Sequence, residues 1–327
     1  MKIRVPEYFE KFQCIADKCK DSCCIGWKIE IDDKTKAKYG ALECEIGREI
    51  AEKTRHGHFP LEENGHCAFL DGKGLCRIIS ALGEGYLCDI CREHPRYYGV
   101  GKDGIEGGVG LGCEAAARII LSLGSIPRII EIERDVHYSD EDAFADISEY
   151  FRECLYRSIF SRCPEETAGI YTAYAAVADE AAFEVSTTRE RVKIAKPMIK
   201  PIDEEALKCL THRMLSILID CEALSDEWCG LVKAAQGVST AEIIKGMDEA
   251  KGLLYYFTHR YVREGVEDMS IGARILFALC SALAVIAISK AVNSDEPLMR
   301  AAVAYSKNIE YSTDNVEFIL DKLSEYL

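Results

Sequence analysis

The sequence is short of long hydrophobic runs and of positive charge. Its first twelve residues, MKIRVPEYFEKF, contain no apolar run as long as a signal peptide requires, so we expect a cytosolic protein in a reducing compartment. The longest apolar stretch, residues 275–289, is shorter than the roughly 20 residues that span a bilayer, and it predicts a buried helix and no membrane partner. The net charge of −15 argues against a nucleic-acid partner, because phosphate binding requires clustered positive charge.

Two further absences narrow the possibilities. We find no repeat at a fixed period and no low-complexity segment. A chain of 327 residues can bury a substantial core without covalent cross-links, so a disulfide scaffold is a weak explanation for its 16 cysteines. The acidic surface would suit a basic or lysine-bearing partner.

The residue pattern changes near residue 139. Before it, glycines recur and short runs such as WKIEI (27–31) resemble strands. After it, apolar residues recur at steps of three and four, which predicts helices at 139–160, 165–184, 202–222, 239–263, 267–292, 296–307 and 312–326. We therefore predict a mainly α protein in which a small irregular Cys-rich metal-binding module, residues 1–124, packs on an all-helical C-terminal domain, residues 139–327.

The cysteines are concentrated in the first third of the chain. Those before residue 114 are Cys14, Cys19, Cys23, Cys24, Cys44, Cys67, Cys76, Cys88, Cys91 and Cys113. The other six lie mostly in helical patterns, where a free cysteine behaves as a small hydrophobic residue. Clustered thiolates in a reducing compartment indicate a soft or borderline metal.

The spacing favours iron–sulfur ligation over zinc without excluding zinc. A closed zinc site usually has two C-x-x-C pairs, and only Cys88 and Cys91 have that gap. Irregular gaps that converge on one site are typical of iron–sulfur clusters. Because Cys23 and Cys24 are adjacent, we expect them to face different directions or different metals. His56, His58, His66 and His94 lie nearby, but histidines among glycines are more often exposed than ligating.

Three strings carry a resemblance to a known family. FQCIADKCKDSCCIGWKIEID (12–32), CAFLDGKGLCRIISALGEGYLCDICREHPR (67–96) and GLGCEAAARIIL (110–121) resemble the motifs of the flagellin lysine-N-methylase family. The likeness covers residues 8–122, and Ala115 stands where the family usually has proline. It implies a protein lysine methyltransferase that uses S-adenosylmethionine, acts on flagellin and carries an iron–sulfur cluster, most simply 4Fe-4S, or another metal such as zinc.

The resemblance also implies which cysteines are ligands. Those that match the family motifs are Cys14, Cys19, Cys23, Cys24, Cys67, Cys76, Cys91 and Cys113. Cys44 and Cys88 fall outside the pattern. The eight ligands are expected either to form one site or to divide between a four-cysteine cluster and a second structural site.

The methyl donor has no conventional binding motif in this sequence. GGVGLG (107–112) leads directly into Cys113, and we interpret it as a flexible connection and not as a dinucleotide-type turn. Methyl transfer requires a neutral lysine, and no catalytic base stands out among 16 tyrosines and 55 acidic residues. Two alternatives to an enzyme stay open: a non-enzymatic zinc- or iron-chelating module, and an iron–sulfur redox sensor.

Overall fold

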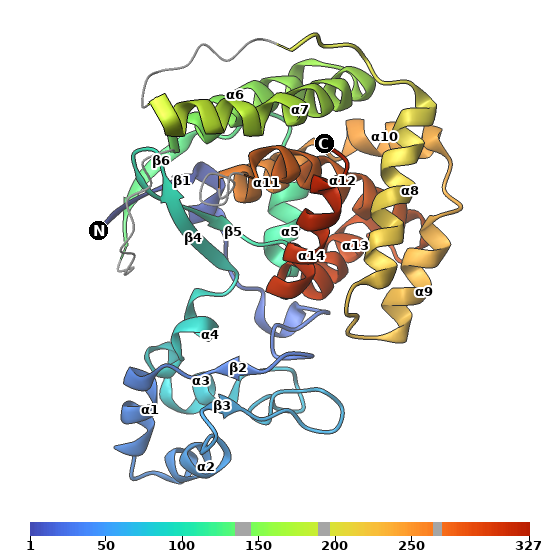
Figure 1. Cartoon of the computed structure of the whole chain (residues 1–327). Coiled ribbons are helices and arrows are strands. Elements are labelled where there is room, and N and C mark those ends of the chain that lie inside the picture. The colour runs from blue at the N-terminus through green and yellow to red at the C-terminus, as the bar shows by residue number, and fades with distance from the viewer. Residues whose placement is uncertain (135–144, 189–196, 264–269) are drawn as a thin grey trace.

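The computed structural model describes residues 1–134, 145–188, 197–263 and 270–327, and it is mainly helical, as predicted. Figure 1 shows a large helical body with a smaller lobe beneath it. The lobe holds α1 (Asp33–Gly40), α2 (Glu45–Lys53), α3 (Arg77–Leu82) and α4 (Asp89–Glu93). The helices of the body are α5 (Glu114–Leu121), α6 (Ala145–Ser161), α7 (Pro164–Thr188), α8 (Glu204–Asp220), α9 (Asp226–Ala235), α10 (Thr240–Glu249), α11 (Lys251–Tyr261), α12 (Ile271–Ala291), α13 (Pro297–Tyr305) and α14 (Thr313–Ser324).

A four-stranded sheet lies at one edge of the body (Figure 1). Its strand order is β4 (Arg96–Gly101), β5 (Gly104–Val109), β1 (Lys2–Pro6) and β6 (Ile129–Glu133). β1 runs parallel to β5 and antiparallel to β6, so the start of the chain is held between two strands more than 100 residues later. A second, two-stranded sheet in the lobe pairs β2 (Ile29–Glu30) with β3 (His58–Phe59), so the predicted strand at 27–31 is confirmed only in part.

Helix α12 is the centre of the body. It contains the predicted apolar stretch, and residues 275–288 are all buried, which confirms the expected buried helix. Its length and composition would allow it to cross a membrane, but 94% of its most apolar window is buried inside the protein. A helix that is apolar on all sides and buried in this way is typical of a protein core.

The remaining helices follow the prediction with two differences. The segment 239–263 is divided into α10 and α11 at Ala250, whose φ of −116° and ψ of 39° are not helical. Helix α9 was not predicted, although Ser225 caps it by accepting a hydrogen bond from the Trp228 amide. The predicted cap at Ser139 lies outside the described residues.

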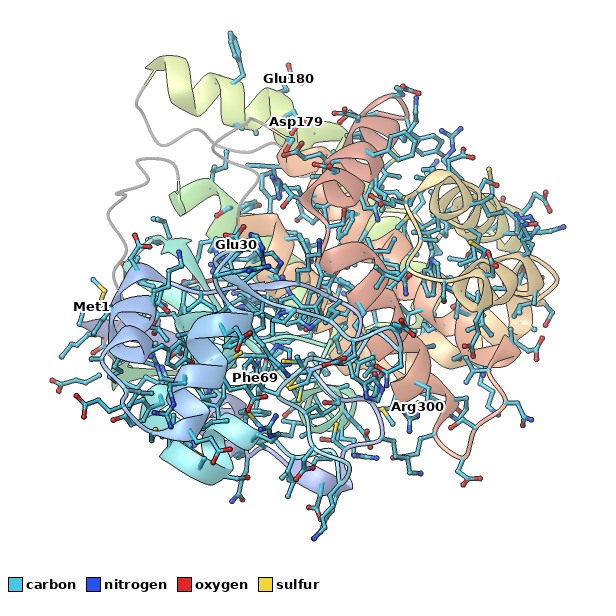
Figure 2. The ribbon with its side chains drawn as sticks, turned by 90° about the horizontal axis from the view of Figure 1, so that it is seen from below. Met1, Glu30, Phe69, Asp179, Glu180 and Arg300 are labelled. Carbon is cyan, nitrogen blue, oxygen red and sulfur yellow. The ribbon has the colours of Figure 1, made fainter. Side chains whose placement is uncertain are left out.

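The buried side chains form two separate cores. One lies in the lobe and consists of Ile29, Ile31, Tyr39, Ile50, Phe59, Cys67, Phe69, Ile78 and Cys88; Figure 2 shows Phe69 within the lobe. The other contains residues of β1, β5 and α5 together with residues of the later helices. Both ends of the segment 1–124 therefore share a core with the helical body. The boundary between residues 124 and 139 lies partly outside the described residues and stays a prediction.

A buried ion-pair network ties β5 to α6. The Glu106 carboxylate, 4% exposed, accepts hydrogen bonds from Arg152, 3% exposed, at 2.7 and 3.3 Å. Arg4 approaches the same carboxylate at 3.4 Å, and Arg263 donates to the Glu106 carbonyl at 3.4 Å. Although burial raises the pKa of Glu106, the Arg152 guanidinium lowers it to about 2, so the carboxylate stays charged. The network fixes the strand that leads to Cys113.

We expect His259 to make stability fall as the pH falls. Burial, helped by the charge of Arg152, lowers the pKa of His259 to about 3. Below pH 6.5 this histidine is protonated in the unfolded chain, where its pKa is near 6.5, but stays neutral in the folded protein. The free energy of unfolding is therefore highest above pH 6.5 and decreases as the pH falls below it. Between pH 6.5 and 5 the loss should be about 2 kcal/mol. Denaturant unfolding at each pH measures it, and the His259→Gln variant should show a flatter profile.

A matched control for this experiment is available in the lobe. His56 is exposed, so the His56→Gln variant should keep the pH profile of the wild type. A His259→Gln profile as steep as the wild-type profile would contradict the role of this histidine.

Candidate functional site

The structure separates the cysteines of the first third into two sets. The thiols of the first set interact electrostatically with one another across the junction between lobe and body; this set consists of Cys14, Cys19, Cys23 and Cys113. Cys14 is exposed, and the other three are partly buried. Cys113 is the N-cap of α5, so β5 and α5 together fix its position.

The second set lies against the core of the lobe. Its members are Cys24, Cys67, Cys76, Cys88 and Cys91, and each interacts electrostatically with others of the set. Cys67 and Cys88 are fully buried. The expectation that Cys23 and Cys24 face different directions is wrong, because their thiols are hydrogen-bonded to each other. That they bind different metals stays a prediction.

Hydrogen bonds link the thiols in pairs. The Cys23 thiol donates to Cys24, and this bond, with further help from Ser22 and Lys307, lowers the pKa of Cys24 to about 7. The same bond and burial raise the pKa of Cys23. Cys91 donates to Cys88 in the same way, which lowers the pKa of the Cys88 thiol. In each pair the accepting thiol, Cys24 or Cys88, ionises more readily than its donor, and both accepting thiols belong to the second set.

The donor chemistry of the two sets fits a soft metal or an iron–sulfur cluster, because both consist of thiols. Among the residues that the structure describes, however, no three Cys, His, Asp or Glu side chains lie close enough together to hold one ion. Ligation would require side-chain rotations that bring the paired thiols of a set together. The ligand set of eight cysteines therefore stays a prediction.

Cys88 was placed outside the ligand pattern, and the structure places it inside the second set. The signal that pointed to it is its C-x-x-C gap to Cys91, which the family motif does not use. Cys44 is exposed and lies in neither set. Of the histidines, His56 is exposed and His58 is partly buried in β3, whereas His94 lies beside the first set at the end of α4.

Polar contacts hold the first set against the body. The Glu114 carboxylate, 1% exposed, accepts hydrogen bonds from the Lys20 amide at 2.8 Å and from the Cys19 thiol at 3.6 Å. Lys307 pairs with Asp21 and donates to the Ser22 carbonyl at 3.2 Å. These contacts fix residues 19–22, which lead into Cys23 and Cys24.

A cleft of about 630 Å³ opens between the lobe and the body. The lobe side consists of Trp27, Lys34 and lining residues from 89 to 95. The body side consists of Arg96, Tyr97 and Tyr98 of β4 together with Gly110, Arg260 and Tyr311. Trp27 packs on Tyr311 with ring centroids 5.1 Å apart, and its indole nitrogen donates to the Cys23 carbonyl at 2.7 Å. The cleft therefore borders the first thiol set.

The glycines of GGVGLG have a structural role that the sequence interpretation missed. Gly107 and Gly108 lie within β5, so the segment is not the flexible connection that we expected. A Cβ atom at Gly108 would overlap the Tyr97 ring, and one at Gly112 would overlap the Tyr311 ring. The glycines are needed because aromatic rings lie directly against the backbone here.

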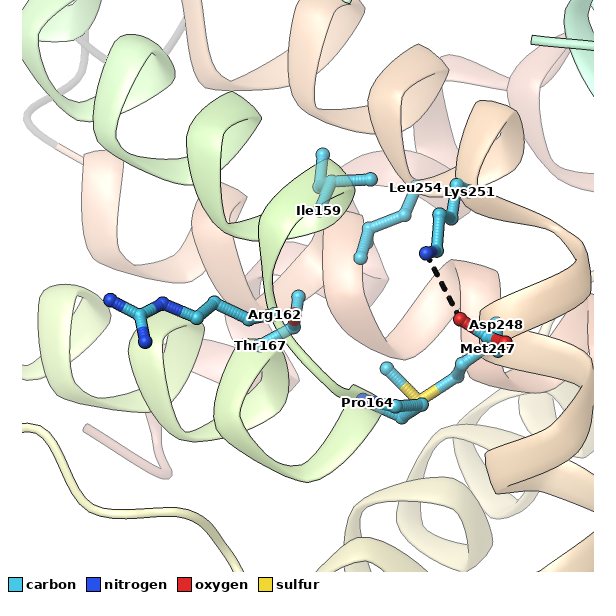
Figure 3. Close-up of a pocket in the computed structure, with 8 residues that line it drawn as sticks. All are labelled: Ile159, Arg162, Pro164, Thr167, Met247, Asp248, Lys251 and Leu254. Carbon is cyan, nitrogen blue, oxygen red and sulfur yellow. Dashed lines mark ion pairs between the residues drawn. The ribbon is translucent and has the colours of Figure 1, made fainter. Parts of the chain in front are cut away.

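Two other pockets are poorer candidates for a ligand. One between α6, α7, α10 and α11 is lined by Ile159, Leu254 and the Asp248–Lys251 ion pair (Figure 3), but its volume of about 10 Å³ is close to the minimum that holds one water molecule. A hollow of about 430 Å³ between α2 and α3 has six lining residues, and its guanidinium, that of Arg77, is already paired with Glu49. A ligand the size of a nucleoside fits best in the cleft.

Comparison with known proteins gives three relatives. The lysine-N-methylases of Salmonella typhimurium (strain LT2) and Salmonella choleraesuis are each 32% identical over 126 residues, which is 35% of this chain. The match spans 31% of the length of each. The flagellar biosynthetic protein FliU of Salmonella muenchen is also 32% identical over 126 residues, and the match covers 75% of its length. No family model and no solved structure matches the chain.

Proposed function

Because the chain belongs to the family of FliU and the lysine-N-methylases, we propose that it is a protein lysine N-methyltransferase. The observation that carries the proposal is the 32% identity to proteins named lysine-N-methylase. The name of the third relative, a flagellar biosynthetic protein, supports a flagellar protein, flagellin, as the substrate. The acidic chain suits such a lysine-bearing partner, and we propose that it acts in the cytosol.

The proposed methyl donor is S-adenosylmethionine. The lone pair of a neutral lysine Nζ forms the N–CH₃ bond while the S–CH₃ bond breaks, which leaves a thioether and an alkylammonium that releases a proton to solvent. The protein must align the two reactants and receive the lysine in its neutral form. The cleft offers a partly dry, aromatic environment for this alignment, since its Trp27, Tyr97 and Tyr311 rings exclude water.

We further propose that the cysteine sets bind a metal, a 4Fe-4S cluster with zinc as the alternative. The ligands would be Cys14, Cys19, Cys23, Cys24, Cys67, Cys76, Cys91 and Cys113, with Cys88 as a further candidate from its position. Bound metal would supply cross-linking of the lobe. The protein residues position it: Glu114 and Lys307 hold the loop of the first set, and the core around Phe69 holds the second.

Methyl transfer can be tested directly with the full chain. We expect anaerobically purified protein, incubated with flagellin and S-adenosylmethionine carrying an isotopically labelled methyl group, to place the label on lysine Nζ, as detected by mass spectrometry. Flagellin whose lysines have been acetylated is the matched control and should stay unlabelled. Absence of methyl-lysine in both flagellin and a whole-cell protein extract would contradict the proposed function.

A further inference from the structure

We propose that the cleft between the lobe and the body is the binding site for S-adenosylmethionine, with Arg96 as the partner of its carboxylate. The inference rests on the proposed function, because that function supplies the donor. It also explains how a chain without a glycine-rich nucleotide motif binds such a molecule. Three features of the cleft point to this ligand: a guanidinium without a hydrogen-bond partner, a cluster of aromatic rings and mixed charge.

The Arg96 side chain has no ion-pair partner within 4 Å among the described residues. It lines the cleft and makes no side-chain hydrogen bond in the described part of the chain, and its Nε is buried. Its guanidinium lies on the rings of Phe9 and Phe12, at 5.6 and 5.1 Å from their centroids, so its position is fixed. Burial and the neighbouring Arg134 charge lower the pKa of Arg96. A partly buried guanidinium that is held in place and has no hydrogen-bond partner is stabilised when a carboxylate binds to it.

A second unpartnered group lies beside Arg96. The Nε2 atom of His94 is buried and has no hydrogen-bond partner among the described residues, although its Nδ1 lies 3.5 Å from the Tyr311 hydroxyl. Burial, with the Lys307 and Arg96 charges, lowers the pKa of His94 to about 4, so the ring is neutral near pH 7. A neutral imidazole nitrogen can exchange a hydrogen bond with a hydroxyl or an amino group of a nucleoside.

Aromatic rings also line the cleft, and the His94 ring is one of them. Trp27, His94 and Tyr311 are mutual neighbours, with centroids 5.1 to 6.3 Å apart. Flat rings in this arrangement stack on an adenine, and their negative faces attract a sulfonium cation. An anion such as a free phosphate gains nothing from these faces, so they favour an aromatic ligand that also carries a positive charge.

The charges of the cleft match a zwitterion. In a chain of net charge −15, its lining includes the cations Lys34, Arg92, Arg96 and Arg260 against the carboxylates Asp89 and Glu93. Arg92 is paired with both carboxylates, and Arg260 is paired with Glu310 at 3.2 Å. Arg96 thus remains for the carboxylate of the ligand. Glu93 is already bonded to Arg92, Arg134 and Tyr98, so the ammonium of the ligand would share the exposed Asp89 carboxylate with Arg92. The volume of about 630 Å³ lies within the usual range for ligand pockets.

The test compares two ligands and two proteins. Isothermal titration of the full chain with S-adenosylmethionine and with decarboxylated S-adenosylmethionine measures each Kd. For Arg96→Gln we expect the Kd for S-adenosylmethionine to rise about 10- to 100-fold, because a charge-assisted hydrogen bond is lost. The Kd for the decarboxylated ligand should stay within about twofold of the wild-type value, since that ligand has no carboxylate to lose. The control variant Arg128→Gln, on the exposed Arg128–Glu7 pair, should change neither Kd.

Each other outcome overturns one identifiable statement. If Arg96→Gln raises the Kd of both ligands equally, or changes neither Kd, Arg96 does not bind the carboxylate. The double variant Tyr311→Phe, Trp27→Leu should bind both ligands more weakly. If its Kd values equal those of the wild type, the donor binds outside the cleft, and the proposed methyl transfer is unaffected by that result. If the wild-type chain binds neither ligand and also forms no methyl-lysine, the proposed function itself fails.

Discussion

Replacing Cys24 by serine is expected to remove bound metal and to unfold the lobe. Cys24 accepts the hydrogen bond of Cys23 and interacts with the thiols of the second set, so it lies at the contact between the two sets. The lobe core is small, and metal binding in such modules is coupled to folding by about 10 kcal/mol in structural zinc sites. Metal analysis after anaerobic purification should show about a tenfold loss in Cys24→Ser and in Cys19→Ser.

Cys44→Ser is the matched control for this experiment. Cys44 belongs to neither set and is exposed, so its replacement should leave the metal content and the circular dichroism spectrum unchanged. Full metal content in both Cys19→Ser and Cys24→Ser would refute the ligand assignment. The absorption spectrum of the wild-type protein separates the two metals, because a cluster is brown and zinc is colourless.

Cys88→Ser extends the same experiment to the residue that the family pattern omits. If Cys88 is a ligand because it lies among the thiols of the second set, Cys88→Ser should lose as much metal as Cys91→Ser. If the family pattern decides, Cys88 packs as a buried hydrophobic residue and its replacement should lower stability with the metal retained.

Much of the helical body could be predicted from the sequence because the signals are local. The apolar run of α12 and the regular spacing of α6 each indicate a helix within one stretch of chain. The sheet could not be predicted in this way. β1 pairs with β5 and β6, which lie about 100 residues further along, and β5 is rich in glycine, which disfavours a strand unless neighbouring rings cover it.

The candidate site was predicted unevenly for the same reason. Cysteine spacing indicated thiols that act together, since that signal depends only on residue type. The cleft depends on side chains brought together from Trp27, residues 94–97 and Tyr311, which no local pattern connects. In the sequence Arg96 cannot be distinguished from the many other basic residues. In the structure it differs from them because its guanidinium lies on the rings of Phe9 and Phe12 and has no ion-pair partner among the described residues.

The largest stability effect in the body is expected for Glu106→Gln. The neutral amide removes the negative charge that Arg152 contacts at 2.7 Å, and Arg152 is 3% exposed, so it cannot recover its hydration. Breaking one side of a buried pair costs about 3–5 kcal/mol. Arg152 keeps its bond to Glu149 at 2.9 Å, which places the expected loss near the lower limit, about 3 kcal/mol, measured by denaturant unfolding.

Two further variants separate charge loss from the effect of any substitution at this position. Glu153→Gln removes an exposed partner of Arg157 on the same helix and should cost less than about 1 kcal/mol. Replacing Glu106 by Leu and Arg152 by Met together should recover part of the loss, because no unpaired buried charge remains. A Glu106→Gln loss no larger than that of Glu153→Gln would mean that Arg152 finds another partner, and β5 would then owe its position to its strand neighbours rather than to this ion pair.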